Sequence, residues 1–134
     1  MTAPAHPIFV ALGATPADAA AQLATSVLST STGTPVMAVT TAGGLLLNTT
    51  NLSGTPGAAT INTPSGKVAI ALGAASVVVT NSLVTTSSTV LCQLQTTDAT
   101  LLYIKSVVPA AGLFTITGNA VSTAAVTVAF FVLN

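Results

Sequence analysis

The side chains able to do acid–base, nucleophilic or metal chemistry are few and widely spaced in this sequence. The single histidine, His6, lies in a proline-rich stretch, whereas a zinc site needs several converging ligands. The single cysteine, Cys92, has no basic neighbour that would activate its thiol. Asp18 and Asp98, the only carboxylates, are far apart in the chain, and nothing indicates that they form the pair that hydrolysis uses. The sequence therefore predicts no enzyme activity, no cofactor and no metal site.

Local structure offers each of these residues another role. Thr15-Pro16-Ala17-Asp18 reads as a helix cap followed by a proline and an acid, which suits the start of a helix. Asp98 follows Thr97 in a predicted turn. Cys92 stands in an apolar strand pattern, where a free cysteine behaves as a small buried hydrophobe.

Charge is scarce throughout the chain. Only 3% of the 134 residues are charged, against about 25% in an ordinary soluble domain. Two lysines and two aspartates cannot release the counterions on which nucleic-acid binding depends, nor dock the chain on anionic lipid. Mean hydropathy is high, at +0.86, but Thr, Ser, Gly and Pro interrupt each apolar run before the roughly 20 residues of a spanning helix. We therefore expect neither a nucleic acid nor a membrane as partner.

An uncharged protein must cover its solvent-facing surface with Thr, Ser, Asn and Gln. A net charge of zero favours association. The composition predicts a protein whose working state is an assembly, with much of its surface against neighbours. A compact monomer with a threonine-rich surface is the alternative.

The pattern divides the chain into residues 1–35, an N-terminal arm with one short helix, and residues 36–134, a β-domain. In residues 1–14, prolines favour an extended chain, and Ile8, Phe9 and Leu12 are candidate contacts with a partner. A frayed terminus is the other interpretation of this stretch.

The predicted helix runs from Ala17 to Leu28, with small and apolar side chains repeating at helical spacing along one stripe. The stretch from Ser29 to Pro35 reads as a linker. Beyond it, the sequence predicts a strand over Val36–Thr40 and a short one over Ala58–Asn62, with turns at Gly43-Gly44 and at Thr63–Gly66.

Residues 67–134 form a regular meander of β-rich runs separated by turn residues. The period of two in these runs is typical of half-buried antiparallel strands. The fold class that follows is mainly β, with an antiparallel β-sandwich or jelly-roll-like body. The side chains predicted to share inward faces are Val68, Ile70 and Leu72; Val90, Cys92 and Leu94; Leu102, Ile104 and Val108; Phe114 and Ile116; and Val126, Val128, Phe130 and Val132.

The last strand carries a second apolar face, because Phe131 and Leu133 alternate with the inward set. A strand that is apolar on both sides is either central in a sandwich or covered by a subunit. We favour a subunit contact and take Phe131 and Leu133, with the three arm residues, as candidate partner contacts.

The stretches VAIALGAASVVVTNSLVT, LQTTDATLLYIKSVVPAAGLFTI and VAFFVLN, which cover about half of the chain, resemble a small β-domain found at the C-terminal end of virion structural proteins of tailed bacteriophages. The TTDAT and VVPAAG turns carry most of the likeness. The resemblance implies a capsid decoration (cement) protein or a head or tail fibre, usually trimeric. For a cement protein it further implies the major capsid protein as partner and a place on the capsid surface of the virion.

Two roles then compete. A cement protein binds between capsomers and is small, and the shortness of this chain and its initial methionine favour that role. A fibre module binds a receptor or glycan, for which the few aromatic residues are ill suited. We expect residues 1–35 to reach neighbouring subunits and residues 67–134 to make a trimer body. A free-standing adhesin or surface-layer protein would share the composition.

Overall fold

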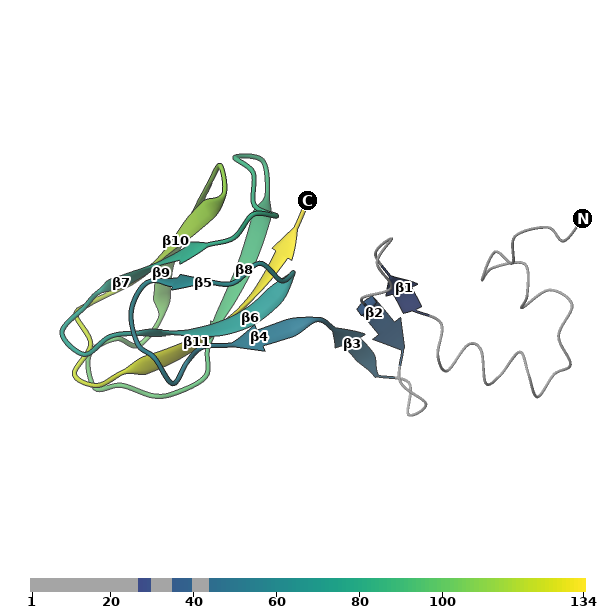
Figure 1. The fold of residues 1–134 in the computed structure, drawn as a ribbon. Coiled ribbons are helices and arrows are strands. Elements are labelled where there is room, and N and C mark those ends of the chain that lie inside the picture. The colour runs from purple at the N-terminus through teal and green to yellow at the C-terminus, as the bar shows by residue number, and fades with distance from the viewer. Residues whose placement is uncertain (1–26, 30–34, 40–43) are drawn as a thin grey trace, which may run out of the picture. The chain divides into compact units, whose positions relative to one another are not determined.

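The structure, a computed structural model, describes residues 27–29, 35–39 and 44–134, with side chains from residue 44 onward (Figure 1). The chain divides into two compact units, Met1–Asn48 and Thr49–Asn134. The sequence pattern had placed a boundary after residue 35. The described residues are mainly β, as predicted.

A three-stranded sheet makes up the described part of the first unit. Its strands are β1 (Val27–Ser29), β2 (Pro35–Val39) and β3 (Leu45–Leu47), in the order β1-β2-β3. Both pairs are antiparallel, with Met37 opposite Leu28 on one side and Leu47 on the other. The strand predicted from Val36 is confirmed, and it starts one residue earlier.

The predicted helix over 17–28 is wrong at its C-terminal end, because Val27 and Leu28 belong to strand β1. Residues 17–26 lie outside the described residues, and no helix occurs in the part of the chain that the structure describes. Pairing with β2 satisfies the backbone of Val27 and Leu28, and such non-local pairing overrides a weak helical pattern. Ser29 and Pro35, assigned to a linker, are strand residues.

Two four-stranded sheets make up the second unit, called here the two-sheet body. Sheet I has the order β4-β6-β11-β8 and sheet II the order β5-β7-β10-β9. The strands of sheet I are β4 (Thr49–Asn51), β6 (Ser65–Ile70), β11 (Val126–Leu133) and β8 (Thr89–Leu94). Those of sheet II are β5 (Ala59–Thr60), β7 (Ser76–Thr80), β10 (Leu113–Gly118) and β9 (Ile104–Ala110).

The strand pairing corrects the prediction of a purely antiparallel body. Strand β4 runs parallel to β6, and β5 runs parallel to β7, while the remaining pairs in both sheets are antiparallel. Both parallel strands are short and lie at a sheet end. Beyond Asn51 the chain continues along β6, where the Leu52 amide donates to the Lys67 carbonyl at 2.8 Å.

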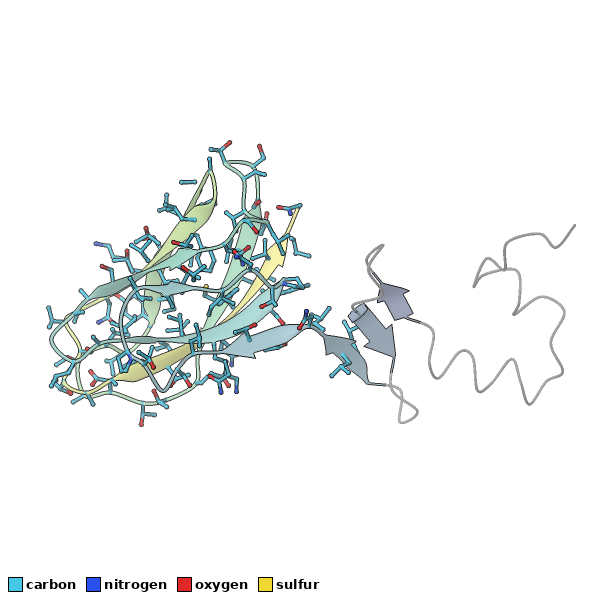
Figure 2. The ribbon with its side chains drawn as sticks, in the orientation of Figure 1. Atoms are coloured by element: carbon cyan, nitrogen blue, oxygen red, sulfur yellow. The ribbon has the colours of Figure 1, made fainter. Side chains whose placement is uncertain are left out.

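The core lies between the two sheets (Figure 2). Phe130 from β11 and Phe114 from β10 meet there edge to face. The largest fully buried apolar side chains of the two sheets are Val68, Ile70, Val126 and Val128 from sheet I and Val79, Phe114 and Ile116 from sheet II, joined by Ile61 and Leu101 from loops.

Alternation along β10 and β11 is as predicted. Phe114 and Ile116 are buried, and so are Val126, Val128, Phe130 and Val132, while the residues between them are not. These runs are rich in β-branched and aromatic side chains, which fit a pleated, half-buried surface. Gly112, with a φ of +77°, makes the turn between β9 and β10.

Three predicted inward residues are exposed instead: Leu72, Leu102 and Val108. Leu72 lies in the turn after β6, which ends at Ile70. In β9 the register against β10 shifts between Ser106 and Ile104, so that Lys105 has no partner residue in β10. This bulge reverses the alternation along β9. Val107 therefore packs against the core in place of Val108. Leu101 and Leu102 precede β9, in a loop, where Leu101 is buried and Leu102 is exposed.

Candidate interaction surface

The side chains with reactive groups do not converge in the two-sheet body. Within residues 44–134, no three His, Cys, Asp or Glu side chains gather where they could hold a metal ion. Cys92 lies half-buried on β8, and burial raises the pKa of its thiol to about 12. A thiol with that pKa stays protonated at neutral pH and is a poor nucleophile. His6 and Asp18 lie outside the described residues.

Asp98 ties two loops together. Its Oδ1 accepts hydrogen bonds from the amides of Thr100 and Leu101, at 2.9 and 2.8 Å. Its Oδ2 accepts from the amides of Thr123 and Ala124, both at 2.9 Å. The amides of Leu101 and Thr100 hold the pKa of this carboxyl well below its usual range, with smaller contributions from the hydroxyls of Thr123 and Thr100. The carboxylate is thus saturated by the protein itself, and its role is structural.

Asn119 reinforces the same loop. Its side-chain oxygen accepts from the amides of Leu102 and Tyr103, and its side-chain amide donates to the Thr100 carbonyl at 3.0 Å. Asn119 therefore cross-links its own loop to the chain that follows the turn predicted at Asp98. Leu102 and Tyr103 are held on the surface, where their side chains are 65% and 60% exposed.

Apolar side chains gather on the outer face of sheet I, where β8 lies beside β11. Phe131 is opposite Leu91 in the register; Leu91 is 55% exposed and Leu133 44% exposed. Phe131 and Ala129 are half-buried between them. An open hollow of about 320 Å³ on this face is lined by Leu91, Cys92, Gln93, Ala129, Phe130 and Phe131. We call Leu91, Ala129, Phe131 and Leu133 the β8–β11 patch.

The structure thus brings together two of the five predicted contact residues, Phe131 and Leu133. Ile8, Phe9 and Leu12 lie outside the described residues. The sequence interpretation missed Leu91, although the alternation along β8 puts it on the same face as Gln93. The period of two places Leu91 on the outer face, but only the pairing of β8 with β11 places it opposite Phe131.

The outer face of sheet II is uncharged along its central strands. Thr115 of β10 lies between Val78 of β7 and Val108 of β9 in the register. Both valines are exposed. The nearest charge in these strands is Lys105, at the bulge in β9. On the outer face of sheet I, Lys67 of β6 lies opposite Ala129. Each outer face therefore offers apolar and hydroxyl groups to a neighbour, with one lysine at its side.

Comparisons with protein families, with curated proteins and with solved structures found no match for this chain. Among the described residues there is no helix of the length and apolar character that crossing a membrane requires.

Proposed function

We propose that the chain is a structural virion protein, most specifically a capsid decoration (cement) protein that binds the outer capsid surface between capsomers. The observation that carries the proposal is the apolar and weakly charged character of exposed strand faces on both sheets, each of which carries a single lysine, Lys67 on β6 and Lys105 on β9. A monomer gains nothing from exposing Leu91, Val108 and Leu133, whereas an assembled protein buries them. The phage context rests on the resemblance of Val68–Asn134 to phage virion domains.

The mechanism would be mechanical. Each copy binds the assembled shell and not its separated subunits, so mass action stabilises the shell by the binding free energy of every bound copy. Burial of apolar area drives this binding, and the binding free energy is what remains after the cost of association and of ordering side chains at the interface. The major capsid protein is the partner in this proposal, and a homotrimer is the expected form of the protein.

The fold proposed for the body is a β-sandwich of the jelly-roll-like kind. Face-to-face packing of two four-stranded sheets around a shared core supports it. A jelly roll also has eight strands in two sheets. The parallel pairs β4–β6 and β5–β7 depart from that pattern at one end of each sheet.

A fibre module that binds a receptor or glycan is the second candidate, and one observation favours it. Tyr103, the only tyrosine of the chain, is 60% exposed beside the exposed Leu102. An exposed aromatic ring is a platform on which a sugar can stack.

The test has two steps. Light scattering gives the mass of the purified chain in solution, and the chain is then incubated with undecorated heads of the phage whose genome encodes it. A trimer that binds the heads at a fixed ratio supports the cement role. A species that ignores heads but binds host cells, and loses that binding in a Tyr103→Ala variant, supports the fibre role.

A further inference from the structure

Strand β8 differs from every other strand at the sheet ends of the two-sheet body. The body has four such strands, and β4 and β5 are only three and two residues long. Strand β9 is long but carries Lys105, Pro109 and the bulge. Charges, prolines, bulges and shortness are the devices by which sheet edges avoid pairing with other chains. Strand β8, Thr89–Leu94, has six residues and none of these devices.

The backbone groups at the free edge of β8 can be identified. The amide of Gln95 donates to the Thr127 carbonyl of the segment that leads into β11, at 2.8 Å. Amides two residues apart in a strand point the same way, so those of Gln93 and Leu91 also face β11. The amides and carbonyls of the alternate residues, Val90, Cys92 and Leu94, therefore point away from sheet I, where the sheet has no further strand.

The side chains at this edge are incompletely covered as well. Val90, Cys92 and Leu94 turn toward the core but are only half-buried, whereas Val128 and Phe130 in the adjacent strand are buried. A strand added beside β8 would cover these three side chains and would extend the β8–β11 patch on the other face.

We propose that β8 pairs with β8 of a second copy of this chain, antiparallel and about a two-fold axis. This contact does not depend on the proposed virion function. Because it is two-fold, it would join copies that belong to different trimers if the protein is a trimer. An antiparallel edge is complementary to itself, because a two-fold axis places each amide of one copy opposite a carbonyl of the other. If Cys92 pairs with Cys92 of the second copy, Val90 lies opposite Leu94. The free backbone amides and carbonyls of all three residues then form hydrogen bonds across the axis.

The lack of charge on β8 and its row of apolar side chains favour a second copy of the chain as the partner at this edge. Strand β8 has no charged side chain, so two copies meet without repulsion and a charged partner would gain nothing there. The half-buried row of Val90, Cys92 and Leu94 would meet the same row of the second copy, which continues the core across the axis.

Area sets the strength of this contact. A six-residue strand is about 20 Å long and the two sheets lie about 10 Å apart, so this edge offers roughly 200–400 Å² to a partner. A stable specific interface takes about 800 Å² from each partner. The contact is therefore weak on its own and depends on protein concentration, and other contacts within an assembly would strengthen it.

Hydrogen exchange of the full chain, followed by NMR over a series of protein concentrations, tests the pairing. In the associated protein, the amides of Val90, Cys92 and Leu94 are expected to exchange at least about tenfold more slowly than in the monomer. The amides of Leu91 and Gln93, which already face β11, serve as internal references and change little. Fast exchange of the three edge amides in the associated protein overturns the proposal, whatever the oligomeric state.

A charge on the edge provides the second test. Leu91→Lys places a lysine diagonally across the axis from its copy, and we expect the dissociation constant to rise by at least roughly tenfold. Val121→Lys is the matched control, because Val121 is also 55% exposed but lies in the loop before β11 and not in β8. Sedimentation equilibrium measures both variants, with thermal unfolding as the check on folding. Equal dissociation constants for Leu91→Lys and Val121→Lys contradict the proposal, as does a wild-type chain that stays monomeric at about 1 mM.

Discussion

The ring of Phe114 on β10 meets the ring of Phe130 on β11 edge to face, with centroids 4.9 Å apart and planes inclined at 66°. One ring comes from each sheet, and both are buried. Edge-to-face pairs of this kind add to the free energy gained by burying their area. This contact joins the two sheets at the centre of the core.

Replacing Phe130 by alanine is expected to lower the free energy of unfolding by about 3–5 kcal/mol, because it removes the ring contact and leaves a cavity. Phe131→Ala is the control, since Phe131 is the next residue but lies half-buried on the outer face. Urea denaturation measures both variants. A loss for Phe131→Ala as large as that for Phe130→Ala would contradict the assignment of inner and outer faces.

Gly66 leaves room for the same ring. A Cβ atom at this position would lie 2.7 Å from Cζ of Phe130 and 2.9 Å from the Thr50 carbonyl oxygen. Gly66→Ala is therefore expected to cost about 1–3 kcal/mol of stability through overpacking. Gly54→Ala is the control, because a Cβ atom there would meet nothing within 4 Å. Urea denaturation measures both variants, and their midpoint concentrations can be compared directly if their m-values are equal. A Gly66→Ala midpoint equal to that of Gly54→Ala would show that the Phe130 ring moves freely.

The lowered pKa of Asp98 makes the stability of the fold depend on pH in the acidic range. Hydrogen bonds from the Leu101 and Thr100 amides hold its pKa in the folded protein well below the ordinary value of 3.8. A carboxyl with a lowered pKa stabilises the fold above its ordinary value, and that contribution is lost as the pH falls toward the folded pKa. We expect the free energy of unfolding to be nearly constant between about pH 5 and 8, and to decrease below about pH 4.

Asp98→Asn tests this account of the acid dependence. In Asp98→Asn, an NH₂ group replaces one carboxylate oxygen. That group only donates hydrogen bonds, so it cannot accept those that backbone amides, such as those of Thr123 and Ala124, donate to the carboxylate. The variant should be less stable at pH 7 and should lose less stability than the wild type on going to about pH 2. Denaturant titrations of the wild type and the variant at several pH values measure this. An unchanged acid dependence in Asp98→Asn would rule out Asp98 as its source.

Cys92 should react slowly with thiol reagents in the folded protein. Burial raises its pKa from 9.0 to about 12, and only the thiolate is nucleophilic. At pH 8, labelling by an aromatic disulfide should be at least about a hundredfold slower in the folded than in the unfolded chain. The control is Gln93→Cys in a Cys92→Ala background, because Gln93 is exposed on the same strand. Similar rates at the two positions would contradict the burial of Cys92.

Short-range patterns in the sequence predicted the strands well, and long-range pairing was beyond them. Alternation found the inward residues of β10 and β11, because neither strand contains a bulge or a turn within its apolar run. The same reasoning failed in β9, where the bulge at Lys105 reverses the faces. Such a bulge depends on the partner strand, which a local pattern does not contain.

The other misses also have non-local causes. Val27 and Leu28 fit a helical stripe, but pairing with β2 makes them a strand. The parallel pairs β4–β6 and β5–β7 join segments that are not neighbours in sequence order. The candidate contacts Phe131 and Leu133 followed from a strand that is apolar on both faces. Leu91 could be added only once β8 was known to lie beside β11.

The proposed function is that this chain covers apolar, weakly charged surface in a virion shell. We would test it first by co-sedimentation of the full chain with undecorated phage heads between roughly 0.05 and 0.5 M salt, a range over which the screening of surface charges increases strongly. The account predicts saturable binding at a fixed ratio to the capsid subunits, with an affinity that salt hardly weakens. Absence of binding to heads, or binding that disappears as salt is raised, would contradict it.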